Sequence, residues 1–422
     1  MKNIKMRYPI YLKEFKCIGG ECEDSCCIGW DVDIDKFTFQ QYESVSDSDM
    51  KNILKSNLIK NKRCQCDEID FAKVKLGENK RCPFLKCDNY CVIHSNLGEE
   101  YLSNVCTSFP RVTNKIDGIY EMSLAVACPE AARILLLKKD GIEFSESDED
   151  LGKHIVSSEV NTKLSEEAYL PVEFLKEIRE TSIKIMKNRK FSLDKRLYIL
   201  GEFINALEDE YEYNCHNTLS FIKEYDIDTV KDSYEENSMN YVIQVDFFKK
   251  LLTMLRVEKD IDSDRFKEYS KEVRIGLNLD EENYLAKNAQ MYIKAFEEYE
   301  KEFIEENSYI FENYIVNFIY SNLFPFCERE SIFDSYIMLL IRYTFIRFYL
   351  VGMYIYHKKN KEALNKALSK EEVVRFIQCF SKVVEHHKTY LIDLLNYIKE
   401  HDFNNLEFVK TLLPALKNQR DR

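Results

Sequence analysis

The C-terminal two thirds of the chain carries a helical pattern of apolar and polar positions. From about residue 164 to residue 417, apolar residues recur at the spacing of amphipathic helices, with few glycines or prolines between them. We predict helices at 172–188, 195–213, 240–256, 283–307, 310–323, 331–357, 371–386 and 390–401. Ser369 and Glu372, just before Val373, form a capping box that marks the start of one of them. This part of the chain is therefore expected to be all-α.

The N-terminal third has a mixed pattern. Residues 1–34 are predicted to be loop with short extended pieces, helix begins near Lys36, and residues 62–96 return to loop. Two apolar runs, 112–116 and 119–126, flank the dipeptide Asp117-Gly118, which predicts a β-hairpin. The second run leads into Cys128-Pro129-Glu130, where proline and glutamate indicate the start of a helix.

An acidic stretch separates these two parts. Residues 144–151 have no apolar period, and we interpret them as a linker or solvated loop. The predicted organisation is a small cysteine-rich α+β module at 1–140, a linker or loop at 141–163, and a larger all-α domain at 164–422. The fold class is mainly α.

One predicted helix is apolar enough to raise the question of a membrane span. Residues 335–357 are mostly apolar, but Arg342 and Arg347 interrupt them near the middle. Charges at bilayer depth are costly, so a buried helix of a helical domain is favoured over a transmembrane segment. Both arginines would need partners if they are buried.

Charge and the N-terminal sequence narrow the function classes. The 422 residues carry a net charge of -13, which argues against nucleic-acid binding. The first residues contain no signal-peptide core, since Lys13, Glu14 and Lys16 break the apolar positions. A cytoplasmic location is expected, and in that reducing compartment clustered cysteines indicate metal binding or catalysis rather than disulfides.

The cysteines are crowded at one end of the chain. Of fourteen, only Cys215, Cys327 and Cys379 lie outside the stretch from Cys17 to Cys128. Gaps of four and then three residues separate Cys17, Cys22 and Cys26, and the same gaps separate Cys82, Cys87 and Cys91. Thiolates on short loops suit a tetrahedral zinc or an iron–sulfur cluster, and the spacing favours neither. A purely structural zinc site is the simpler alternative.

Individual positions add local arguments. Adjacent Cys26 and Cys27 cannot easily point the same way, so they are expected to serve different metals or roles. Cys128 at a helix N-terminus is placed where unpaired N–H groups favour a thiolate. His94, close to Cys91, stays a secondary candidate ligand. No Gly-x-Gly-x-x-Gly or Gly-Lys-Ser/Thr motif occurs, so no nucleotide-binding fingerprint is present.

Several of these segments resemble the flagellin lysine-N-methylase family and, more distantly, small bacterial proteins described as zinc- or iron-chelating. The similar segments are Cys22-Glu-Asp-Ser-Cys26-Cys27-Ile-Gly-Trp30, Cys82-Pro-Phe-Leu, Cys91-Val-Ile-His94, Phe109-Pro110-Arg111 and Cys128-Pro129-Glu130-Ala131-Ala132. Glu312-Asn313-Tyr314 also looks like the methylases. The matching cysteines are Cys17, Cys22, Cys26, Cys27, Cys82, Cys91, Cys106 and Cys128, whereas Cys64, Cys66 and Cys87 are not regular features of the pattern.

The resemblance implies an enzyme that transfers methyl groups from S-adenosylmethionine to lysine side chains of flagellin. It also implies a cysteine-bound [4Fe-4S] cluster, with zinc as the alternative, and the eight matching cysteines as candidate ligands. Such a cluster would bind the amino-carboxylate end of S-adenosylmethionine, support a radical route or shape the site. Arg111 is a weak candidate for binding the cofactor carboxylate, and no catalytic residue is indicated. The alternative from another class is a non-catalytic metal-chelating scaffold. The sequence does not indicate the oligomeric state.

Overall fold

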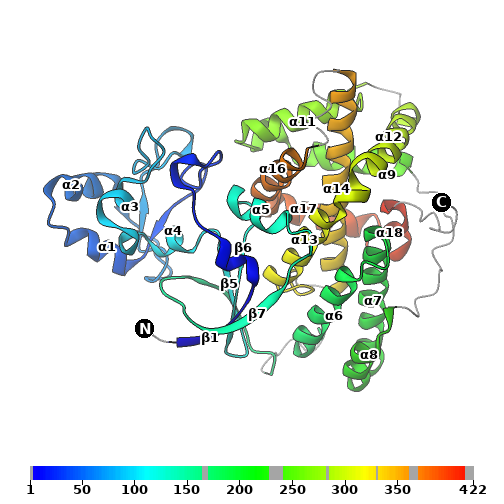
Figure 1. Ribbon diagram of the computed structural model, residues 1–422, viewed down its shortest axis with the longest axis horizontal. Helices are drawn as coiled ribbons and strands as arrows, with labels where there is room; N and C mark the ends of the chain where they lie inside the picture. Colours follow the sequence, from blue (N-terminus) through cyan, green and yellow to red (C-terminus); the bar gives the residue numbers. More distant parts are fainter. Residues whose placement is uncertain are drawn as a thin grey trace. The chain divides into compact units, whose positions relative to one another are not determined.

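The computed structural model describes residues 3–163, 170–227, 241–281, 285–328, 331–360 and 369–413. The chain divides into two compact units. Unit 1 comprises Met1–Ile134 and Glu143–Asn161, and unit 2 comprises Leu135–Ile142 and Thr162–Arg422. The chain therefore passes from one unit to the other more than once (Figure 1).

Unit 1 contains a five-stranded mixed sheet with the strand order β7-β1-β6-β5-β8. Its strands are β1 (Asn3–Pro9), β5 (Arg111–Ile116), β6 (Ile119–Leu124), β7 (Phe144–Asp150) and β8 (Val156–Val160). The hairpin of β5 and β6 is confirmed, and both residues of its turn, Asp117 and Gly118, have positive φ, 48° and 84°. Two positive φ values are the signature of the turn that matches the twist of the strands.

The acidic stretch is a strand, so the prediction of a linker or loop at 141–163 was wrong there. β7 pairs with β1 along its whole length, which places Glu146 opposite Arg7 and Asp148 opposite Lys5. β7 and β8 are the edge strands of the sheet. An edge strand can consist largely of charged side chains and lack the alternation of apolar and polar residues seen in other strands. Pairs of opposite charge across the two strands stabilise it. A sequence pattern based on apolar periodicity misses such a strand.

A second, three-stranded sheet in unit 1 has the order β2-β4-β3. Its strands are β2 (Asp33–Ile34), β3 (Leu58–Lys60) and β4 (Ala72–Val74), and the short helices near it are α1 (Lys36–Glu43), α2 (Ser48–Asn57), α3 (Val92–Leu97) and α4 (Asn104–Ser108). Asp35 and Asp47 cap α1 and α2 by accepting hydrogen bonds from backbone N–H groups. One apolar cluster packs Ile34, Leu54 and Ile93 together with Cys82.

Unit 2 is helical, which confirms the expected all-α character over its described residues. Its helices are α6 (Leu175–Lys187), α7 (Leu193–Asn214), α8 (Thr218–Glu224), α9 (Tyr241–Met254), α10 (Val257–Asp260), α11 (Asp264–Gly276), α12 (Leu285–Tyr299), α13 (Glu305–Ser321), α14 (Ile332–Lys359), α16 (Lys370–Phe380), α17 (Lys388–Glu400) and α18 (Leu406–Leu412). The predicted cap is present, because Ser369 accepts a hydrogen bond of 3.1 Å from the backbone N–H of Glu372. Residues 164–169, 228–240, 282–284, 329–330, 361–368 and 414–417 of the predicted pattern lie outside the described residues.

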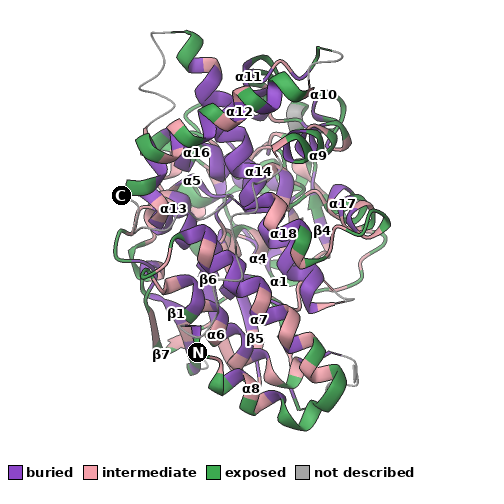
Figure 2. Ribbon diagram, turned by 90° about the vertical axis from the view of Figure 1, so that its right-hand side faces the viewer, coloured by how far each residue is buried: buried purple, intermediate pink, exposed green. Residues whose placement is uncertain are grey.

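Helix α14 forms the centre of unit 2 and is buried over nearly all of its length (Figure 2). Within the described residues it is the one helix long and apolar enough to cross a membrane, and its apolar window is 100% buried in the protein. Both of its arginines have acidic neighbours. Arg347 pairs with Glu300 at 2.5 Å, on the π-helical turn η8 (Glu300–Ile304), and Arg342 lies 3.7 Å from Glu328. The burial and these partners support the core-helix interpretation.

Helices α11 and α14 approach each other at two glycines. A Cβ atom added at Gly276 would lie 2.2 Å from the carbonyl oxygen of Gly352. The two backbones can pack this closely only because neither position carries a side chain.

Candidate metal centre

Four of the candidate cysteines of unit 1 form a group in which every thiol lies within electrostatic range of the other three. We call Cys27, Cys82, Cys91 and Cys106 the quartet. Burial raises the pKa of Cys82 to about 12, and nearby Cys27, Cys106 and Cys91 add to the effect. Cys106 also lies within electrostatic range of Cys27 and Cys91. The pKa of Cys91 is raised by burial and by Cys27.

Local structure holds the quartet in place. The backbone N–H of Cys82 donates a 2.9 Å hydrogen bond to the carbonyl of Cys27, which joins the two cysteine-rich loops. Cys91 is the residue before α3, and Cys106 lies in α4, where its N–H donates to the cap Ser103 at 3.3 Å. Cys82 is buried, Cys27 and Cys91 pack against the same apolar cluster, and Cys106 is accessible at the surface. The quartet thus combines residues from four separate segments.

Three other cysteines form a second group, which we call the trio: Cys17, Cys22 and Cys128. Burial raises the pKa of Cys128 to about 11, and Cys22 and Cys17 contribute in the same direction. Burial also raises the pKa of Cys22, with a smaller contribution from Cys17. Arg111 lies within electrostatic range of Cys17 and Cys128, although burial lowers its pKa. The weak carboxylate-binding candidate from the sequence is therefore a neighbour of the trio.

Cys128 precedes helix α5 (Pro129–Leu136), as predicted, but its thiol is not acidic. Burial raises its pKa, and the hydrogen bonds from the N–H groups of Ala131 and Glu130 offset only part of that rise. The expectation of an easily formed thiolate at this helix start was wrong for the protein without metal, because desolvation outweighs the helix N-terminus.

Cys26 lies between the quartet and the trio. It hydrogen-bonds to Cys27, an interaction that raises the pKa of Cys26, and the nearby Cys106 and Cys17 raise it further after burial. The same hydrogen bond lowers the pKa of Cys27 to about 7. Cys27 is the more acidic member of the pair. That the two adjacent cysteines serve different metals or roles stays a prediction.

Backbone N–H groups point at the sulfur atoms of most of these cysteines. The Gly19 N–H lies 3.4 Å from the sulfur of Cys17. The equivalent donors are Asp24 to Cys22, Phe84 to Cys82, Ile93 and His94 to Cys91, and Glu130 and Ala131 to Cys128. Hydrogen bonds of this polarity stabilise the thiolate over the thiol. Thiolate is the form of cysteine that binds a metal. The chemistry of these sulfur donors therefore fits a metal ion.

The cysteines outside the family pattern behave differently. Cys64 donates its S–H to the carboxylate of Asp70 at 3.3 Å, so it acts as a protonated thiol. The backbone N–H of Cys66 donates to the same carboxylate at 2.8 Å, and Cys87 is exposed. The side chain of His94 is exposed as well, and its contribution to Cys91 comes from its backbone N–H.

The thiols are gathered but not closed around a point. Among the residues that the structure describes, no three His, Cys, Asp or Glu side chains stand close enough together to hold an ion as they are arranged. Side-chain rotation would have to bring the sulfurs together.

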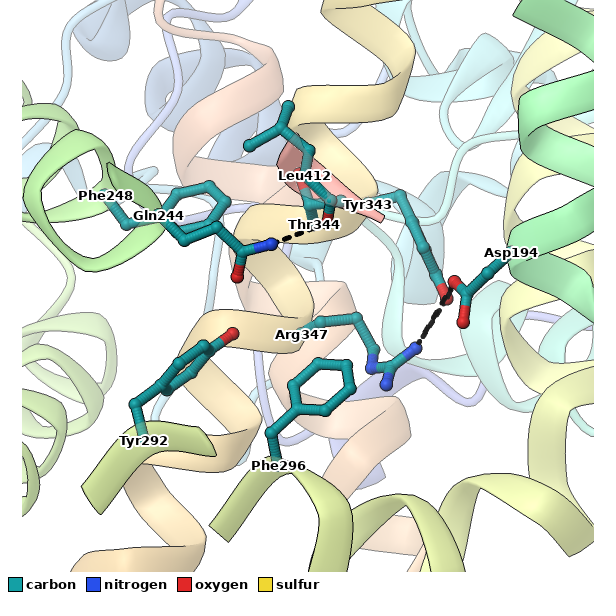
Figure 3. A pocket seen from close by; sticks show the side chains of 9 residues that line it. All are labelled: Asp194, Gln244, Phe248, Tyr292, Phe296, Tyr343, Thr344, Arg347 and Leu412. Carbon is teal, nitrogen blue, oxygen red and sulfur yellow. Dashed lines mark hydrogen bonds and ion pairs between the residues drawn. The ribbon is translucent and has the colours of Figure 1, made fainter. Parts of the chain in front are cut away.

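Unit 2 has a small pocket beside α14 (Figure 3). It lies among Asp194, Gln244, Phe248, Tyr292, Phe296, Tyr343, Thr344, Arg347 and Leu412, and the free space is about 10 Å³. Tyr343 donates to Asp194 at 2.9 Å and accepts from Arg347 at 2.6 Å, while the guanidinium of Arg347 lies 4.7 Å from the centre of the Phe296 ring. The space holds about one water molecule and is too small for S-adenosylmethionine or a lysine side chain.

A larger, open groove of about 720 Å³ runs along α7 and α8. It is lined by Ala206, Asp209, Glu210, Glu212, Tyr213 and Phe221. Carboxylates and aromatic rings form an environment that cationic groups favour.

The segment Glu312-Asn313-Tyr314, which resembles the methylases, forms a buried clamp in unit 2. Glu312 accepts hydrogen bonds from Arg189 at 2.8 and 2.9 Å and from Arg196 at 2.6 Å. The side-chain amide of Asn313 donates to the carbonyls of Leu136 and Lys138 at 3.2 and 2.8 Å. No local sequence pattern indicates these pairings, because more than a hundred residues separate the partners.

Comparisons with known proteins identify a matching family and several relatives. The profile of the family described as FliB lysine N-methylase C-terminal domain matches residues 179–412, more than half of the chain. The flagellar biosynthetic protein FliU of Salmonella muenchen is 32% identical over 147 residues, which cover 35% of this chain and 85% of that protein. The lysine-N-methylases of Salmonella typhimurium and Salmonella choleraesuis are each 31% identical over 163 residues, 38% of this chain and 38% of each relative. No solved structure matches.

Proposed function

The chain belongs to the FliB lysine N-methylase family, and we propose that it transfers methyl groups from S-adenosylmethionine to lysine side chains of flagellin. The observation that carries this proposal is the family match over residues 179–412. The names of the relatives, flagellar biosynthetic protein FliU and lysine-N-methylase, also support flagellin and lysine as the substrate. The match to the two lysine-N-methylases spans 38% of their length, so the donor and the substrate are inferred.

The reaction sets clear chemical demands. The lone pair of a lysine nitrogen forms a bond to the methyl carbon, the carbon–sulfur bond breaks, and its electrons remain on sulfur as the neutral thioether. A lysine with a pKa of about 10.4 is almost wholly protonated at neutral pH. The enzyme must therefore desolvate the amine or accept its proton before transfer.

We further propose that the cysteines of unit 1 hold a metal centre, either an iron–sulfur cluster or zinc. The support is the donor set itself, thiols from separated segments that receive backbone N–H hydrogen bonds. When bound, an iron–sulfur cluster would supply a Lewis-acidic iron or an electron. Arg111, beside Cys17 and Cys128, would attract the carboxylate of S-adenosylmethionine.

The test is methyl transfer in a defined system. Anaerobically purified protein is incubated with unmodified flagellin and S-adenosylmethionine labelled in its methyl group, and labelled lysines are located by mass spectrometry. Label on lysine that requires both the protein and S-adenosylmethionine supports the proposal. A protein that binds metal but neither binds S-adenosylmethionine nor labels flagellin would be a chelating scaffold instead.

A further inference from the structure

We propose that the outer edge of strand β7 binds an extended, lysine-bearing segment of a protein partner by adding it to the five-stranded sheet. β7 pairs with β1 on one side, and among the strands that the structure describes none pairs with its other side. The choice of a lysine-bearing protein as partner rests on the proposed function. Binding can be measured without methyl transfer, however, so the two proposals can fail separately.

The register of β1 and β7 determines which backbone groups of β7 face outward. The N–H of Ile10 donates a 2.8 Å hydrogen bond to the carbonyl of Glu143, and the same antiparallel register continues along all of β7. In an antiparallel pair, every second residue directs its N–H and C=O to the partner strand, and the residues between direct theirs away. Counted from Glu143, the outward residues include Glu146, Asp148 and Asp150.

The residues with outward backbone groups are also acidic and exposed. The side chains of Glu146, Asp148 and Asp150 lie on one face, because they alternate along the strand. The pairing with β1 shows which kind of strand β7 accepts, since Arg7 lies opposite Glu146 and Lys5 lies opposite Asp148. A partner strand with lysines at alternate positions would repeat this arrangement of opposite charges on the free side of β7.

Charge also argues against other occupants of this edge. Exposed charges on edge strands hinder pairing with unsuitable chains, and a second copy of this protein paired through β7 would place carboxylates opposite carboxylates. A lysine-bearing segment is attracted by the same carboxylates, and main-chain hydrogen bonds add affinity. The opposite edge strand, β8, is a weaker candidate: it has five residues, and its one acidic residue, Glu159, already accepts a 2.7 Å hydrogen bond from Lys115.

The experiment measures binding of synthetic peptides to the full-length protein by fluorescence anisotropy. The probe is a labelled peptide of alternating lysine and threonine. One control peptide carries glutamate in place of lysine, and a second carries proline in place of threonine and cannot form a strand. We expect only the lysine–threonine peptide to bind, with an affinity that falls as the salt concentration rises. Its binding should slow hydrogen exchange at the amides of Glu146, Asp148 and Asp150, which a purely electrostatic contact would not do.

Two substitutions at Asp148 separate the backbone from the charge. Asp148→Pro removes an outward N–H together with the carboxylate and leaves the hydrogen bonds to β1 in place, a position at which edge strands tolerate proline. Asp148→Asn removes only the charge. We expect Asp148→Pro to weaken peptide binding about tenfold or more and Asp148→Asn about threefold or less. Should Asp148→Pro fail to fold, the hydrogen-exchange pattern of the wild type decides alone.

Three results would overturn the inference: no binding of the lysine–threonine peptide, equal binding of the glutamate or proline peptide, or binding without protection of the three amides. Methyl transfer gives a separate answer. If the protein methylates flagellin and Asp148→Pro leaves the KM for flagellin unchanged, the inference is wrong and the proposed function stands. If the peptide binds with the expected protection but flagellin is not methylated, the docking edge stands and the proposed function is wrong.

Discussion

Glu312 offers the sharpest test of the packing in unit 2, through the substitution Glu312→Gln. Its carboxylate is only 1% exposed and accepts hydrogen bonds from Arg189 and from Arg196. Glutamine keeps the shape but removes the charge, so Arg196, itself 2% exposed, loses the carboxylate with which it pairs in the clamp. Removing one partner of a buried ion pair costs about 3–5 kcal/mol.

The two arginines contribute unequally to this cost. The side chain of Arg189 is 44% exposed, so solvent screens its pairing with Glu312 and Arg189→Gln should cost about 1 kcal/mol or less. Arg196, with a side chain only 3% exposed, carries most of the effect. The double substitution Arg196→Met with Glu312→Leu should be less destabilising than Glu312→Gln alone, because no buried charge is then left unpaired.

The assay is chemical denaturation followed by circular dichroism at helical wavelengths, which reports mainly on the helices of unit 2. We expect Glu312→Gln to lower the unfolding free energy by about 3 kcal/mol or more and the thermal midpoint by roughly 10 °C. A loss below about 1 kcal/mol, or equal losses for Glu312→Gln and Arg189→Gln, would refute the assignment of a buried charged clamp.

Three further predictions follow from named contacts. Burial raises the pKa of Glu312, but its hydrogen bonds with the two arginines more than offset this effect, and the net pKa is lowered. The stabilisation of the folded protein by the Glu312 carboxylate is complete above about pH 4.3, the pKa of an unfolded glutamate, and is lost as the pH falls through the lower folded pKa. Urea titrations of wild type and Glu312→Gln should therefore converge in acid. Gly276→Ala places a Cβ atom 2.2 Å from the Gly352 carbonyl and should cost about 3 kcal/mol in denaturant midpoints, whereas Ile275→Ala, at a position 45% exposed, should change stability by about 0.5 kcal/mol or less. Arg111→Gln removes the charge proposed to attract the carboxylate of S-adenosylmethionine, so it should raise the KM for S-adenosylmethionine about tenfold or more with a smaller change in kcat. Steady-state methyl transfer measures both constants, and an unchanged KM would mean that Arg111 does not bind the cofactor.

Local sequence signals predicted the elements whose formation depends on their own residues. The hairpin at Asp117-Gly118 forms because both turn residues tolerate positive φ. Helix α14 was recognised because an apolar pattern on all sides fits a helix that neighbours cover on all sides. The cap at Ser369 depends only on a residue three positions away. Each of these signals lies within a few residues of the structure that it specifies.

Features that depend on distant partners were not predictable in this way. Strand β7 looked like a solvated acidic linker because its stabilising partner, the basic strand β1, lies about 140 residues earlier. The grouping of the cysteines has the same origin. Spacing suggested that Cys82, Cys87 and Cys91 form a set, but the fold replaces Cys87 with Cys27 and Cys106, which come from other segments.

The direction of the hydrogen bond at each sulfur distinguishes the candidate ligands more clearly than spacing does. At Cys91 and Cys128 the sulfur accepts hydrogen bonds from backbone N–H groups, which offset part of the rise in thiol pKa that burial causes. A cysteine whose S–H donates to a carboxylate, as Cys64 does to Asp70, must break that bond and place a second negative charge beside the first in order to bind. Under the proposal of a metal centre, a metal would therefore select the first kind of cysteine. Because the fold alone sets which sulfurs face amides and which face carboxylates, the ligand set is a property of the folded loops rather than of the cysteine count.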